Sequence, residues 1–238
     1  MKNKIAFYPL SSAVCFLLFS FFWPLTADHR SLSFAADDWK TKPFTQWSQG
    51  EAKKIITNSP WTKIGDVLYE AQLQRSQGRV NAQNLGNLGG DNPNRTVPFQ
   101  LTWYTKIPRQ ASCRQLQLIQ KFSDEEAARM VEQDKPKDQW KFIFKSSLAM
   151  AVRQQADDAA QAITFLKRDD GVKLQVAQIE DPPGSGYVNY LFPMYLPDGS
   201  AFINDSTKEF SFETRVRGSL VRAKFKVADC RLNGLLEP

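Results

Sequence analysis

The carboxyl-terminal part of the chain contains the run Phe210-Ser211-Phe212-Glu213-Thr214-Arg215-Val216-Arg217-Gly218-Ser219-Leu220-Val221-Arg222-Ala223-Lys224-Phe225-Lys226-Val227, in which apolar and polar side chains alternate. A period of two is typical of β-strands, because successive side chains point to opposite faces of a sheet. We therefore expect two antiparallel strands joined by a turn at Arg217-Gly218-Ser219. Arg222, Lys224 and Lys226 form a basic row on the face opposite the apolar one; it is either an ordinary solvated strand face or a site for an anionic ligand.

Upstream of this hairpin, further strands are expected at residues 97–104, 140–144, 163–167, 172–179 and 187–192, where apolar and β-branched side chains are enriched. The segments 163–167 and 172–179 are joined by Arg168-Asp169-Asp170-Gly171. The Asp-Gly step in this connection favours a tight hairpin turn.

Helices are expected at 111–121, 124–133 and 153–162, and the second of them begins with a capping box at Ser123 and Glu126. An earlier helix starts with the same arrangement at Ser48 and Glu51 and stops before Pro60. Together these elements predict an α+β fold that is mainly β. We expect an antiparallel sandwich or partly open barrel of seven or eight strands, with helical inserts and an N-terminal helical arm.

The amino terminus has the layout of a secretory signal peptide. Lys2 and Lys4 precede an uncharged apolar segment from Ile5 to Leu25. The small residues of Ser33-Phe34-Ala35 favour cleavage before Ala36, and Leu25-Thr26-Ala27 is a second cleavage site. An uncleaved anchor is the alternative, since the segment approaches the roughly 20 residues that span a bilayer. In both cases the rest of the chain is expected in the periplasm or outside the cell, because the lysines keep the amino terminus on the cytoplasmic side of the membrane.

The sequence thus divides into a signal peptide at 1–35, an N-terminal helical arm at 36–74, a flexible polar loop at 75–95 and a β-rich core domain at 96–238. The loop is rich in Gln, Asn, Gly and Ser, a composition typical of flexible segments. Trp39, Trp47 and Trp61 lie in the arm around its helix. Aromatic residues in this position either dock an arm onto a core or form an exposed interaction surface.

The composition excludes several classes of chemistry. His29 is the only histidine and would leave with the signal peptide, which excludes Ser-His-Asp and Cys-His catalysis and argues against a transition-metal site. The net charge of +6 arises without a stripe of basic and aromatic residues, so a nucleic-acid partner is not expected. Cys113 and Cys230 could form a disulfide in an oxidising compartment, or remain two buried thiols. No residue is identified as catalytic, metal-binding or cofactor-binding.

The arm also carries a resemblance to known sequences. The string Pro43-Phe44-Thr45-Gln46-Trp47-Ser48-Gln49-Gly50-Glu51-Ala52-Lys53-Lys54-Ile55-Ile56-Thr57-Asn58-Ser59-Pro60-Trp61 resembles the opening of a set of uncharacterised exported proteins of acidobacteria. Their shared pattern is Trp-Ser, Glu-Ala, an aliphatic pair and then Ser-Pro-Trp, and their tails resemble Leu191-Phe192-Pro193 and the run from Val221 to Val227. The resemblance implies export and a shared fold, and it transfers no catalytic residue, because that set has no assigned activity.

These observations predict an exported, non-enzymatic binding or interaction module for an envelope protein, a glycan or a surface, with membrane contact only through the amino-terminal segment. One alternative is a glycan hydrolase that works with two carboxylates. Its candidate acids are Asp169, Asp170, Glu180 and Asp181. A second alternative is a carrier of a small apolar ligand. Its candidate cavity residues are Tyr187, Tyr190, Phe192 and Tyr195.

Overall fold

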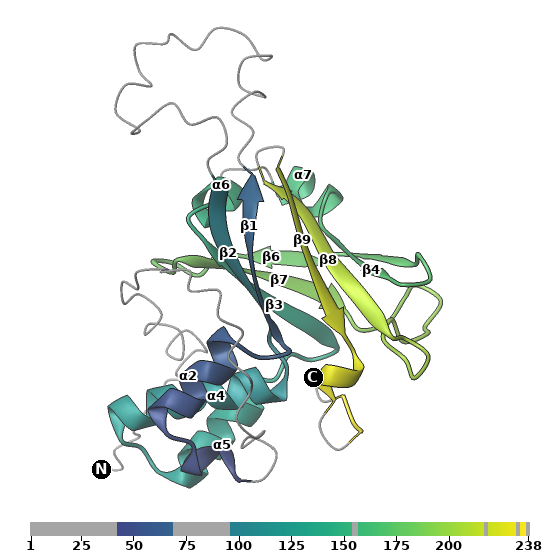
Figure 1. Ribbon diagram of the computed structural model, residues 1–238. Helices are drawn as coiled ribbons and strands as arrows, with labels where there is room; N and C mark the ends of the chain where they lie inside the picture. The colour runs from purple at the N-terminus through teal and green to yellow at the C-terminus, as the bar shows by residue number, and fades with distance from the viewer. Residues whose placement is uncertain (1–41, 69–95, 154–156, 217–218, 232–233, 237–238) are drawn as a thin grey trace, which may run out of the picture.

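The computed structural model describes residues 42–68, 96–153, 157–216, 219–231 and 234–236. The predicted signal peptide at 1–35, both predicted cleavage sites, Trp39 and the predicted polar loop at 75–95 lie outside these residues. Figure 1 shows two sheets that face each other, with a group of helices below them.

The described strands form two antiparallel sheets. The first has the order β1-β2-β3-β7-β6 and consists of β1 (Thr62–Leu68), β2 (Thr96–Trp103), β3 (Gln139–Ser146), β7 (Tyr187–Pro193) and β6 (Gln178–Glu180). The second has the order β5-β4-β8-β9 and consists of β5 (Lys173–Gln175), β4 (Phe165–Arg168), β8 (Glu209–Val216) and β9 (Ser219–Lys226). The prediction of a mainly β, α+β sandwich is confirmed.

The helices surround the ends of this sandwich. They are η2 (Phe44–Gln46), α2 (Gln49–Thr57), α4 (Lys106–Gln120), α5 (Asp124–Gln133), α6 (Ala149–Arg153), α7 (Asp157–Ala162) and η4 (Ala228–Cys230). The sequence placed the start of α4 at Ala111, whereas it begins at Lys106 and contains Pro108 in its first turn. Proline fits there because the amide at that position has no acceptor inside the helix. Of the helix expected at 153–162, the described residues lie in α6, which starts earlier at Ala149, and in α7; residues 154–156 lie outside the described residues.

Both predicted helix caps at Ser48 and Ser123 are present, but only the first is a complete capping box. Ser48 Oγ accepts from the Glu51 amide, and the Glu51 carboxylate accepts from the Ser48 amide at 2.7 Å. Glu51 also pairs with Lys42, and hydrogen bonding to Lys42 and the Ser48 amide lowers the pKa of this carboxyl to about 2. At Ser123 only the bond from the Glu126 amide is found in the described structure.

The hairpins follow the predicted pattern, with one correction. β8 and β9 pair along their whole length, and β4 and β5 pair around the turn that Gly171 closes with φ +88°. The single strand expected at 172–179 is divided between the sheets, because Val176 still bonds Thr164 whereas Ala177 already donates to Leu191 on β7. This segment therefore links the two sheets on one side of the sandwich.

β1 corrects the predicted domain layout. The sequence assigned residues 36–74 to a helical arm, but Thr62–Leu68 pairs with β2 in full register and is part of the first sheet. β1 lies beside β9 of the second sheet (Figure 1), and no ladder joins the two strands within the described residues. The sandwich is therefore open along this seam.

Large aromatic side chains fill the space between the sheets. Trp103 is fully buried on β2 and lies 4.9 Å from Phe210 on β8, measured between ring centroids, in an edge-to-face arrangement. Phe142 on β3 is equally buried and contacts rings from both sheets. Such pairs add to the stabilisation that burial of apolar area already supplies. A smaller cluster of Cys113, Ala127 and Val131 holds α5 against α4.

Candidate functional site

The predicted interaction surface divides into buried and exposed members. Trp47 and Trp61 are each only 1% exposed and belong to the main core, so of the two alternatives docking applies to them and the exposed surface does not. Trp47 lies beside Phe44 in an edge-to-face contact, and its carbonyl accepts from the Arg114 Nε at 2.7 Å. The physical reason is that the arm docks onto the core through these rings, which removes their apolar area from water.

The basic row lies on the exposed face of β9, as the alternation predicted. Arg222 Nε is 2.9 Å from Glu213 Oε1, and Lys224 Nζ is 3.2 Å from Glu209 Oε1. Lys226 lies at the end of the strand, next to η4. It is the member of the row that lines a surface cavity.

Two adjoining surface cavities, lined mainly by charged and hydroxyl-bearing residues, form a groove at this end of the second sheet. The larger has a volume of about 620 Å³, the smaller about 270 Å³, and Asp169 and Thr207 line both. Three separate segments supply the lining: the β4–β5 turn, the loop that leads into β8, and η4 with the residues after it. The other lining residues are Arg168, Asp170 and Ser206 in the smaller cavity, and Asp205, Lys208, Glu209, Lys226, Ala228, Asp229 and Arg231 in the larger one.

Arg168 fixes the turn side of the groove. Its guanidinium pairs with the Asp170 carboxylate, donates to the Phe202 carbonyl at 3.0 Å and lies over the Phe202 ring. The Asp170 carboxylate also accepts from the Val172 amide at 3.1 Å. The bond from Arg168 is the main cause that lowers the pKa of Asp170, and it raises the pKa of Arg168. Asp170 is therefore a charged anchor of the turn at neutral pH.

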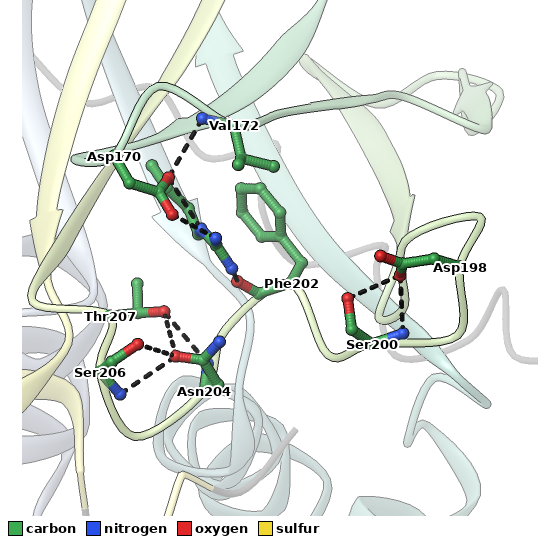
Figure 2. A network of polar contacts seen from close by, with 9 residues as sticks. Asp170, Val172, Asp198, Ser200, Phe202, Asn204, Ser206 and Thr207 are labelled. Atoms are coloured by element: carbon green, nitrogen blue, oxygen red, sulfur yellow. Dashed lines mark hydrogen bonds and ion pairs between the residues drawn. The ribbon is translucent and has the colours of Figure 1, made fainter.

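Short polar side chains hold the loop on the opposite side. Asn204 Oδ1 accepts from the Ser206 amide at 3.0 Å, from the Ser206 hydroxyl at 2.7 Å and from the Thr207 hydroxyl at 3.1 Å (Figure 2). Side-chain bonds of this kind replace backbone bonds in tight turns. Earlier in the chain, the Asp198 carboxylate accepts from the amide and the hydroxyl of Ser200, and these bonds lower the pKa of Asp198.

Charges of both signs meet in the larger cavity. Arg231 Nη2 lies 3.3 Å from Asp205 Oδ1, and Arg231 also donates to the Gly234 carbonyl at 3.0 Å. Within the part of the chain that the structure describes, Lys208 and Lys226 have no ion-pair partner. The groove therefore offers two lysine ammonium groups beside several carboxylates.

The four candidate acids of a glycan hydrolase lie on elements of different sheets. Asp169 and Asp170 lie in the β4–β5 turn of the second sheet. Glu180 lies on β6 of the first sheet, where its carboxylate accepts from the side-chain Nδ2 of Asn189 at 3.3 Å, and Asp181 follows it directly. A glycosidase needs two carboxyl groups that flank one bond at roughly 5–10 Å. Asp169 and Asp170 line the surface cavities described above, whereas Glu180 and Asp181 line neither of them.

The residues proposed to line an apolar cavity are part of the core. Tyr187, Tyr190 and Phe192 are at most 1% exposed, and the Tyr190 ring packs against Phe212 of the facing sheet at 5.1 Å between centroids. Burial raises the pKa of the Tyr190 hydroxyl, which stays protonated. Tyr195 is 51% exposed and lies outside the core. Tyr190 and Phe192 fill the space between the sheets, Tyr187 points to the other face of β7, and Tyr195 is exposed, so these four residues do not line one cavity.

The structure contains no disulfide between Cys113 and Cys230. Cys113 lies on α4, where its thiol donates to the Ala127 carbonyl, whereas Cys230 lies in the main core on η4. Among the described residues, no group of three or more His, Cys, Asp or Glu side chains could hold a metal ion. None of the described helices is both long and apolar enough to cross a bilayer.

The thiols allow a direct test by alkylation. Both cysteines are buried, and burial raises the pKa of Cys230 to about 12, so the reactive thiolate is scarce at neutral pH. We expect iodoacetamide to leave both residues unmodified in the native protein. After unfolding without reductant, both should be modified, as peptide mass mapping would show. Modification only after reduction would instead demonstrate a disulfide.

No known protein family matches this chain, and no curated protein does so either. Among solved structures, it is similar to the crystal structure of a protein of unknown function from Burkholderia pseudomallei K96243. The two are 12% identical with a TM-score of 0.38, and the match covers 58% of this chain and 79% of the other. A likeness at this level supports no inference about function.

Proposed function

We propose that this protein is an exported binding module, without catalytic activity of its own, that uses the groove to bind a charged segment of a cell-envelope protein. The observation that carries the proposal is the set of charged residues that line the groove. Two adjoining cavities of about 620 and 270 Å³ meet there, and charged and hydroxyl side chains from three segments line them.

The chemistry of the lining favours a protein segment over a small apolar ligand. Small-molecule sites are predominantly apolar and aromatic, whereas no aromatic residue lines either cavity. Carboxylates and ammonium groups side by side complement a partner that carries both charges. Complementary charges of this kind give specificity and fast association more than affinity.

Lys208 and Lys226 are the groups most available to such a partner. Both are exposed, both line the larger cavity, and neither is used by an ion pair within the described structure. By contrast, Arg168 and Asp170 neutralise each other and fix the shape of the wall. Binding through exposed lysines should weaken as salt rises, because the Debye length falls to about 8 Å at physiological ionic strength.

Export is the second component of the proposal. It is supported by Lys2 and Lys4 ahead of the uncharged segment from Ile5 to Leu25 and by the small residues that follow. Export would place the groove in the envelope, where a partner protein could reach it.

Site-specific photocrosslinking in the native host tests the groove. A photoreactive residue in place of Asp229, which is exposed and lines the groove, should give a discrete protein adduct that decreases with added salt. The matched control has the same residue in place of Glu125, an exposed acid on α5. Adducts of the same mass and yield at both positions, or none at position 229, would contradict the proposal.

A further inference from the structure

The outward face of the second sheet is strongly basic. In the register of the four strands, Leu166, Leu174, Phe212 and Phe225 point into the core, so their neighbours in sequence point outward. The charged residues on this outward face are Lys167, Lys173, Arg215, Arg222, Lys224 and Lys226, together with the acids Glu209 and Glu213. This face of the sheet therefore carries six basic side chains and only two acidic ones.

Ion pairs leave part of this charge uncompensated. Glu213 pairs with Arg222 and Glu209 with Lys224, which uses both acids of the face. Within the described structure, Lys167, Lys173 and Lys226 have no ion-pair partner. The excess positive charge thus extends from β5 to β9, across the width of the sheet.

Lys167 and Lys173 are directly opposite each other across β4 and β5. Like charges in this position destabilise a strand pair, so the pairing weakens the hairpin unless an anion relieves it. Lys173 Nζ lies 4.6 Å from the centre of the Phe165 ring, so the Lys173 side chain lies over its neighbour on the outward face of the sheet. Lysines on edge strands also discourage strand-to-strand aggregation, which accounts for Lys173 on β5 and for the basic residues of β9. It does not account for Lys167, because β4 is an interior strand.

We propose that this face docks the protein onto an anionic phospholipid surface. Strands lie about 4.8 Å apart, and residues on one face of a strand repeat about every 7 Å, so the cations form a two-dimensional array. An array of this kind matches a plane of lipid phosphates better than a single linear polyanion. Basic clusters bind anionic membranes through the sum of such contacts. This function is separate from the groove, although Lys226 borders both surfaces.

Vesicle cosedimentation of the full chain tests the proposal. The probe is phosphatidylglycerol mixed with phosphatidylcholine, compared with phosphatidylcholine alone, since this difference cancels any uptake through the apolar amino terminus. We expect binding to the anionic vesicles to exceed binding to the neutral ones and to fall at high salt. The double variant K167E/K173E should lose at least about tenfold in affinity for anionic vesicles.

Two controls keep the result interpretable. The variant R129E/K137E has the same change in charge on exposed residues of α5 and the loop after it, and should bind like the unmodified protein. If K167E/K173E melts at a lower temperature, K167Q/K173Q replaces it and should lose affinity in the same direction.

Three results would overturn the proposal. The first is equal binding to neutral and anionic vesicles. The second is an equal loss of affinity in the K167E/K173E and R129E/K137E variants. The third is retention on an immobilised polyanionic glycan without binding to vesicles, which would assign this face to a glycan instead.

Discussion

Replacing Phe142 with alanine is expected to lower the free energy of unfolding by about 3–5 kcal/mol. Phe142 is fully buried at the centre of the sandwich. Ring centroids from both sheets surround it at 5.6 to 6.1 Å, and they belong to Trp103, Phe192, Phe210, Phe212 and Phe225. The loss combines the transfer of the ring to water with a cavity that the neighbouring rings fill only in part.

Urea unfolding followed by tryptophan fluorescence measures this loss. The control is Ile64→Ala on β1, where the side chain is 59% exposed and the change should stay within about 0.5 kcal/mol. If the two substitutions had equal effects, Phe142 would not lie at the centre of the core, and the packing of the two sheets described above would be incorrect.

Charging the amino-terminal apolar segment is expected to abolish export. Leu17→Arg together with Leu18→Arg places two positive charges in the segment that a signal peptide must keep apolar. An alkaline phosphatase fused after Trp39 reports export because it is active only outside the cytoplasm. We expect its activity to fall to the level of a fusion that lacks residues 1–35.

The matched control replaces the same leucines with isoleucine, which preserves the apolar character of the segment. This fusion should remain as active as the unmodified one. Equal activity of the arginine and isoleucine variants would show that the segment does not direct export, and the assignment of the protein to the envelope would fail. The groove could still bind a partner, so this result is distinct from failure of the crosslinking test.

The sequence predicted the central elements of the fold because their alternation is regular. β9 alternates strictly between buried and exposed residues, and β8 alternates between apolar and polar residues although most of both faces are buried. β1 was missed because its inward positions include Lys63 and Gly65, which hide the alternation. The structure shows why these residues are tolerated: Lys63 Nζ lies 5.5 Å from the centre of the Phe225 ring, and the Phe99 ring occupies the space beside Gly65.

The candidate site was predictable only in part, because it depends on contacts between distant segments. Asp169 and Asp170 were identified as candidate acids, yet nothing near them in the sequence indicates that the loop before β8 and η4 lie beside them. Trp47 and Trp61 are a second example of residues whose place could not be predicted from the sequence. Their residue type fits an exposed patch and a docked arm equally well, and only the packing of the arm decides between the two.

The central claim is that this protein binds its partner at the groove, and crosslinking from position 229, compared with position 125, tests it most directly. The account predicts a discrete, salt-sensitive protein adduct from the groove position and none of that mass from α5. Indistinguishable adducts from the two positions would contradict it.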